Sequence, residues 1–164
     1  MSDEVQTPGA PPEKRPLLER LTREEKVLAG CSLGTVLTCF FPWYSVSAGG
    51  FGSSAQGIDF TWGVLALLTS FAAGGLVVGL RAEIVHLDDE LARKIPFFAA
   101  VASAACVLLY LLFGGPRGMA GEFREMQEAM GVSAGKTVWP WIALVLMGTA
   151  AGFAKRRRAE GGPD

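Results

Sequence analysis

Apolar residues concentrate in four long stretches of this chain, separated by short polar segments. The stretches cover about residues 26–43, 60–80, 95–113 and 138–154, and each holds roughly 17 to 21 residues. An α-helix of that length, at 1.5 Å per residue, crosses roughly 30 Å of hydrocarbon. A helix that is apolar on every face needs a large protein or lipid around it. The pattern therefore predicts four membrane-crossing helices.

The ends of the first stretch carry local signals for a helix start and a helix stop. Thr22 followed by Glu25 has the spacing of a capping box, directly ahead of the apolar run. Pro42 has no N–H for the carbonyl of Thr38, so the helix is expected to kink or end around 41–43. These signals predict a helix that begins near Thr22 and stops at the proline.

Length and composition favour one domain with polar tails. Residues 1–16 are polar and rich in proline, 17–158 hold the four stretches, and 159–164 are polar again. Half of the 164 residues are hydrophobic, which leaves too little polar chain to cover four apolar helices in water. The predicted fold class is all-α, an integral membrane four-helix bundle. Within its first outer loop, residues 44–59, the alternation from Tyr44 to Ser47 allows a short β-hairpin, while the glycines also suit an irregular loop.

Charge is distributed unevenly between the polar segments, although the formal net charge is only −1. Twelve of the 15 Lys and Arg residues fall in the N-terminal segment, the connector 81–94 and the C-terminal segment. Four crossings place these three segments on one side, and basic residues favour the cytoplasmic side. We therefore expect a plasma-membrane protein with both termini in the cytoplasm.

All six Trp and Tyr residues fall at stretch ends that four crossings would place on the opposite, outer side. Indole and phenol rings favour the interface between lipid and water, so anchoring is one interpretation. The other is a small apolar or lipid-like ligand held between the outer helix ends, by Trp43, Tyr44, Trp62, Trp139 and Trp141.

Small residues recur at four-residue spacing in each stretch, which places each pair on one helix face and lets helices approach closely. This predicts tight packing at the cytoplasmic half of the bundle, and a dimer-forming face and plain compositional bias both stay open. The pairs are Gly30 with Gly34, Gly75 with Gly79, Ala99 with Ser103, and Gly148 with Gly152.

The second outer loop contains a methionine-rich stripe at helical spacing. It is formed by Met119, Phe123, Met126 and Met130. Such a helix is expected to lie on the outer leaflet or on its own bundle, and the alternative is an adaptable surface for a partner.

Candidate chemistry is sparse. His86, the single histidine, lies in the charged connector, and the three cysteines lie inside apolar stretches without metal-ligand spacing. Phosphate-binding and dinucleotide-binding motifs are absent. The basic run Lys155–Arg158 is interpreted as a contact with anionic lipid, so no nucleic-acid partner is expected. We expect no enzyme activity, cofactor or metal.

The segment from Leu21 to Gly30, followed by Phe40-Phe41-Pro42-Trp43-Tyr44-Ser45-Val46, resembles a loose group of small bacterial four-helix membrane proteins. They share a capped start of the first helix, a Phe/Leu-Pro-Trp-Tyr exit and a Gly/Ser-rich outer loop. The likeness covers roughly residues 17–80. It implies a bacterial plasma-membrane location and no activity.

Two functions remain as expectations. The first is a non-enzymatic accessory or scaffold subunit that binds membrane lipids and either a membrane-protein partner or copies of itself. The alternative is a component that binds or transports a lipid or small apolar ligand through an aromatic cavity at the outer leaflet.

Overall fold

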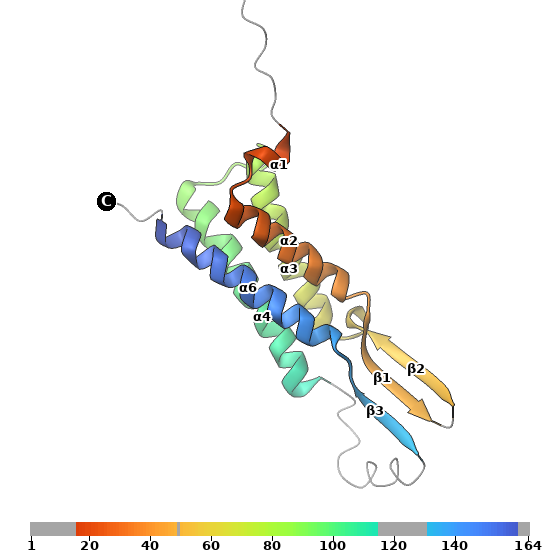
Figure 1. Ribbon diagram of the computed structural model, residues 1–164. Helices are drawn as coiled ribbons and strands as arrows, with labels where there is room; N and C mark the ends of the chain where they lie inside the picture. Colours follow the sequence, from red (N-terminus) through yellow and green to blue (C-terminus); the bar gives the residue numbers. More distant parts are fainter. Residues whose placement is uncertain (1–15, 49, 115–130, 161–164) are drawn as a thin grey trace, which may run out of the picture.

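The computed structural model describes residues 16–48, 50–114 and 131–160. Four long helices lie side by side, and a small sheet projects from one end of them (Figure 1). The helices are α2 (Arg23–Thr38), α3 (Thr61–Arg81), α4 (Asp89–Phe113) and α6 (Trp139–Glu160). A single-turn helix, α1 (Leu17–Arg20), precedes α2, and a 3-10 turn, η1 (Gly57–Asp59), precedes α3.

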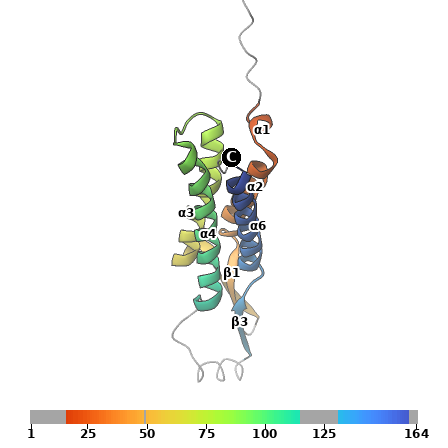
Figure 2. The same ribbon diagram turned by 90° about the vertical axis from the view of Figure 1, so that its left-hand side faces the viewer.

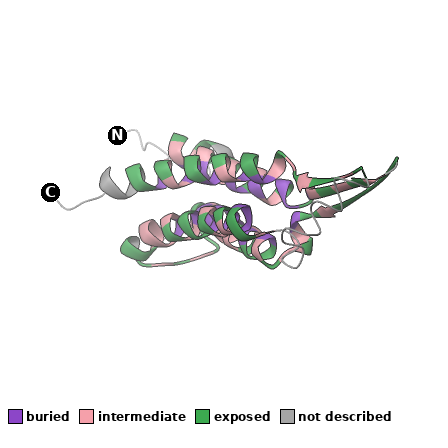
Figure 3. Ribbon diagram, turned by 90° about the horizontal axis from the view of Figure 1, so that it is seen from below, coloured by how far each residue is buried: buried purple, intermediate pink, exposed green. Residues whose placement is uncertain are grey.

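The four helices form a ring in which each packs against two others. α2 contacts α3 and α6, and α4 contacts the same two helices. Figure 2 shows the pair α3–α4 beside the pair α2–α6, with the strands extending beyond the helix ends. Figure 3 shows that buried positions line the space between the pairs, while much of the outward surface is exposed.

The sheet is antiparallel, with strand order β2-β1-β3. Its strands are β1 (Pro42–Ala48), β2 (Phe51–Gln56) and β3 (Val132–Lys136). The hairpin of β1 and β2, which the alternation after Tyr44 allowed, is present. The sequence did not indicate β3, because its five residues contain only one β-branched side chain and pair with a strand far away along the chain.

The all-α bundle with four membrane crossings is wrong. A three-stranded sheet accompanies the helices, and within the described ranges only two helices are long and apolar enough to cross a membrane, Thr61–Arg81 and Glu90–Phe113. α2 has 16 residues, short of the roughly 20 that a crossing needs. α6 mixes its apolar residues with Pro140 at the start and a basic run at the end.

Helix boundaries explain part of this difference. α2 begins at Arg23 with Thr22 as its N-cap, and the capping box with Glu25 is confirmed. It ends at Thr38, four residues before Pro42, because the residues around the proline have joined the sheet. α4 begins at Asp89, six residues before the expected start, so that Pro96 lies inside the helix.

Two apolar clusters form the core, one toward each end of the helices. The cluster far from the sheet contains Leu28, Val77, Ala100, Met147 and Ala150. The cluster at the base of the sheet contains Trp43, Ala66, Val107, Tyr110 and Ala143. The second cluster joins strand to helix and therefore fixes how the sheet is held.

Candidate functional site

The base of the sheet is built around Trp43, whose side chain is fully buried. Its indole Nε1 donates to the carbonyl of Thr38 at 2.8 Å, so the carbonyl freed at the end of α2 is satisfied. The Trp43 ring packs against Tyr110 of α4, with centroids 4.8 Å apart, and the Tyr110 hydroxyl donates to the Trp43 carbonyl at 3.2 Å. Strand β1 is thereby tied to two helices through one residue.

Strand β3 is attached to the same point. The N–H of Thr137 donates to the Trp43 carbonyl at 3.1 Å, and its hydroxyl donates to the carbonyl of Pro42. The ammonium of Lys136 donates to the carbonyl of Leu111 and lies 5.9 Å from the centre of the Tyr110 ring. The root of the sheet is therefore held by α4 as well as by β1.

Two glycines allow the close approach of η1, α2 and α3 beneath Trp43. A Cβ atom at Gly57 would lie 2.7 Å from Trp43 Cε2 and 2.9 Å from the backbone of Cys39. A Cβ atom at Gly63 would lie 1.8 Å from the carbonyl oxygen of Gly57. Neither position has room for a side chain, so the sheet root requires glycine at both.

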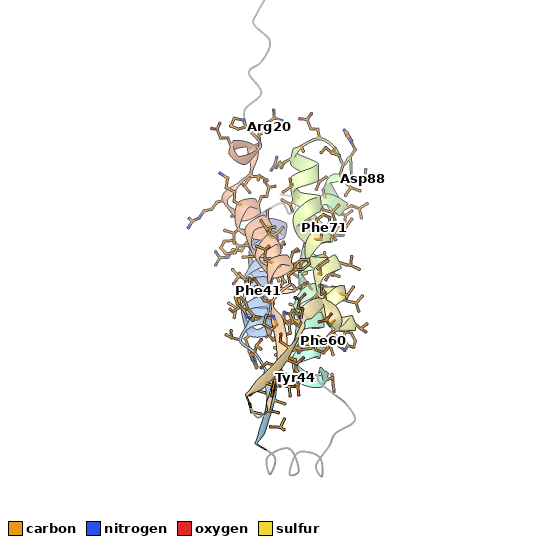
Figure 4. All side chains as sticks on the ribbon, turned by 90° about the vertical axis from the view of Figure 1, so that its right-hand side faces the viewer. Arg20, Phe41, Tyr44, Phe60, Phe71 and Asp88 are labelled. Atoms are coloured by element: carbon orange, nitrogen blue, oxygen red, sulfur yellow. The ribbon has the colours of Figure 1, made fainter. Side chains whose placement is uncertain are left out.

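The sheet projects away from this root with its outer strands open. β1 is the central strand. Among the described residues, β2 and β3 each pair with β1 alone, so the outer edge of each is unpaired. β2 is largely exposed, and Phe51 at the hairpin tip is 86% exposed. Figure 4 places Tyr44 on this projecting end and Arg20 and Asp88 at the far end of the molecule.

The predicted aromatic belt is gathered at the sheet end, mostly as packing. Trp62 and Trp139 are half-buried against the cluster that contains Trp43. The Trp139 ring also stacks on Phe41, with ring centroids 4.1 Å apart. Tyr44 is half-buried in β1, whereas Trp141 is 55% exposed on α6.

The predicted small-residue pairs divide into contacts and open positions. Ser103 is buried, and its hydroxyl lies 2.7 Å from that of Ser70 on α3. Ala99 is half-buried against the cluster far from the sheet. A Cβ atom at Gly34 would meet Leu146, and one at Gly79 would meet Val85. The remaining glycines would bring a Cβ no closer than ordinary van der Waals contact, and they are Gly30, Gly75, Gly148 and Gly152.

An ion pair between the buried carboxylate of Glu25 and the partly exposed Arg81 lies at the end of the molecule far from the sheet, and the sequence did not predict it. Glu25 is 1% exposed, accepts from the N–H of Thr22 at 2.9 Å and accepts from Arg81 Nε at 2.9 and 3.1 Å. The capping-box spacing identified Glu25, but no local pattern identifies Arg81 as its partner. This pair joins the start of α2 to the end of α3.

A groove runs between α2 and α3 on the outside of the helices, with a volume of about 490 Å³. Its walls come from about three turns of α2 and about two and a half turns of α3, and they include Gly30, Leu33, Phe71 and Gly75. Lys26, in the first turn of α2, lies toward the end of the groove that is far from the sheet.

Other candidate chemistry is limited. His86 is exposed in the connector between α3 and α4, and the part of the chain that the structure describes brings no three His, Cys, Asp or Glu residues together. The methionine-rich stripe 119–130 lies outside the described residues. Comparisons with protein families, with curated proteins and with solved structures give no match for this chain.

Proposed function

We propose that this protein is a membrane-associated, non-enzymatic accessory or scaffold subunit, whose projecting sheet pairs with a partner. The observation that carries the proposal is the open sheet, held on apolar helices by the buried contacts of Trp43. A rigid root and a free edge are what a docking strand requires, because main-chain hydrogen bonds supply the affinity.

Membrane association is supported by the two apolar helices. Only 33% of the apolar window of α3 and 28% of that of α4 are buried, whereas a core helix of a soluble protein is mostly buried. Large side chains such as Phe71, 69% exposed, and Leu68, 57% exposed, face outward from α3. We infer that α3 and α4 cross the bilayer as a hairpin.

The charges near the helix ends orient this hairpin. Arg81, Arg93 and Lys94 flank the connector between α3 and α4, at the end of the molecule opposite the sheet (Figure 1). Positively charged connectors favour the cytoplasm, so the connector faces inward and the sheet faces outward. The partner is then expected on the outer side.

Strand β2 carries few of the features that discourage edge pairing. Its sequence, Phe51 to Gln56, contains no Lys and no Pro, which are the usual protections of an exposed edge. Ala48 pairs with Phe51 across a two-residue connection. Residues that close such a connection normally form a hydrogen-bonded pair, so by alternation we expect the N–H groups of Gly52 and Ser54 to face the open edge.

A matched pair of proline variants tests this edge. Ser54→Pro removes an N–H that faces outward, whereas Ser53→Pro removes one that the hairpin itself uses. Tagged protein is isolated in native lipid, and co-purifying proteins, including untagged copies of this chain, are quantified by mass spectrometry. We expect Ser54→Pro to keep its fold and lose a stoichiometric partner, and Ser53→Pro to lose both. Retention of every co-purifying protein by Ser54→Pro at wild-type ratios would remove the proposal.

A second candidate function is the binding of a lipid or small apolar ligand. The predicted aromatic residues mostly fill the base of the sheet, so the observation that favours this function is the groove between α2 and α3. Its volume of about 490 Å³ lies within the range of ligand sites, roughly 300–1,000 Å³.

A further inference from the structure

We propose that the groove between α2 and α3 holds one acyl chain of an anionic phospholipid, with the lipid phosphate beside Lys26. The proposal rests on the membrane association proposed above and adds a specific ligand site to it. Four observations carry it: the shape of the groove, the nature of its walls, the position of its single cation and its direction along the helices.

The shape of the groove comes from small residues on facing helices. Gly74 meets Ser32 at the floor, where a Cβ atom would lie 2.8 Å from Ser32 Cβ, so the two helices touch there. Outside this contact, a Cβ atom at Gly30 would meet nothing within 4 Å, and one at Gly75 would meet only Phe71, at 3.9 Å. Side chains are missing at these two positions, and a channel remains.

The walls are apolar and favour a chain over a helix. Leu33, 61% exposed, and Phe71, 69% exposed, stand on opposite sides of the groove, on α2 and α3. A partner helix, with a diameter of about 10 Å, would meet these two side chains before its backbone reached the glycines. A single hydrocarbon chain is narrower and would pass between them.

Charge marks one end of the groove. Lys26 is exposed, and the ion pairs found among the described residues engage other cations. The carboxylate of the neighbouring Glu25 accepts hydrogen bonds from Arg81 Nε at 2.9 and 3.1 Å. Lys26 is therefore available to a phosphate, which lysine binds as a compact point charge.

The direction of the groove matches that of a membrane lipid. Lys26 lies in the first turn of α2, near the basic connector between α3 and α4, where a headgroup would lie. The groove continues to Val36 near the end of α2 and to Ser70 in the middle of α3. Ten residues of helix separate Lys26 from Val36, which corresponds to roughly 15 Å at 1.5 Å per residue. The headgroup and chain of one lipid would follow this line.

Lipid titration monitored by native mass spectrometry tests the site. Full-length protein in detergent is titrated with phosphatidylglycerol and with phosphatidylcholine carrying the same chains. Gly30→Leu fills the groove from a position with open space, and Gly148→Leu adds the same side chain at an open position on α6. Lys26→Gln removes the charge. A thermal melt of each variant establishes that it is folded.

We expect wild-type protein to retain one phosphatidylglycerol in preference to phosphatidylcholine. Gly30→Leu should weaken this binding by at least about tenfold. Lys26→Gln should weaken it about fivefold and abolish the preference between the lipids. Gly148→Leu should change neither.

Equal retention of phosphatidylglycerol by folded Gly30→Leu and by wild type would overturn the site. Loss of a co-purifying polypeptide in Gly30→Leu, with lipid binding unchanged, would assign the groove to a protein helix instead. Extraction of wild-type protein from membranes by alkaline carbonate would contradict the membrane association itself, an outcome separate from failure of the groove.

Discussion

Replacement of Gly63 by alanine should loosen the root of the sheet. A Cβ atom there would lie 1.8 Å from the Gly57 carbonyl oxygen, whereas ordinary contacts begin at 3.4 Å, so the neighbouring backbone must move by more than 1 Å. Gly57 in turn lies against Trp43 and Cys39 and has no free space to move into. The strain therefore reaches the residue that ties the sheet to the helices.

The magnitude follows from two opposing effects. Overpacking in a closed site costs typically 1–3 kcal/mol, and alanine in place of glycine in a helix gains up to about 1 kcal/mol. Gly75→Ala on the same helix gains the helical contribution alone, because its Cβ would only meet Phe71 at an ordinary 3.9 Å. The helical contribution is common to both variants, so we expect them to differ in free energy of unfolding by the overpacking cost, about 1–3 kcal/mol, with Gly63→Ala the less stable.

The assay is unfolding of detergent-solubilised protein by increasing dodecyl sulfate, followed by tryptophan fluorescence and circular dichroism. Trp43 and Trp62, both in or against the cluster at the sheet root, report on the root. A Gly63→Ala variant as stable as Gly75→Ala would refute the packing described around Gly57.

Two further predictions concern the buried carboxylate and the buried thiol. Glu25→Gln should lower the free energy of unfolding by about 1–3 kcal/mol. This range allows for solvent screening of the ion pair, because the Arg81 side chain is 42% exposed. Glu83→Gln, at an 81% exposed side chain, should change little, and equal effects in dodecyl sulfate titrations would contradict the burial of the Glu25 pair. Burial raises the pKa of the Cys39 thiol to about 11, so at pH 8 only roughly a thousandth is thiolate. In a variant retaining only Cys39, maleimide labelling at pH 8 should be slow until the protein unfolds, and fast labelling of the folded protein would show that Cys39 is open to solvent. The thiol is neutral in the folded protein up to a higher pH than in the unfolded chain, so its contribution to the free energy of unfolding should be lost as pH rises from about 9 through 11.

Local signals in the sequence predicted local structure well. The capping box from Thr22 to Glu25 gave the start of α2, and the alternation after Tyr44 allowed the hairpin. Both depend on residues close together along the chain, where backbone geometry alone sets the outcome.

Hydropathy, in contrast, overestimated the number of membrane-crossing helices. Hydropathy places the apolar run through Phe41 and Trp43 in a helix, but these residues form the turn and strand after Thr38. Apolar residues continue past the end of α2 because Trp43 of β1 is also buried. A buried position is apolar in a helix and in a strand alike, so hydropathy does not mark where one ends and the other begins. Strand β3 and the partner of Glu25 depend on contacts between distant segments, which no local pattern records.

The candidate sites divide in the same way. Trp43, Trp62 and Trp139 were expected together and lie in or against one cluster, but as packing around the root of the sheet. The groove was not predicted, because it depends on which glycines face open space. Gly30 has no side chain opposite it, whereas Gly34 faces Leu146. The spacing of four residues is the same for both.

The orientation of the helical hairpin is tested most directly by cysteine accessibility. Phe51→Cys at the tip of the sheet and His86→Cys in the connector are made in a background with the three native cysteines replaced by alanine. Each is labelled with a membrane-impermeant maleimide in intact cells and in inside-out vesicles. We predict labelling of position 51 only in intact cells and of position 86 only in vesicles. Labelling of both from the same side would contradict a hairpin of α3 and α4 that crosses the membrane.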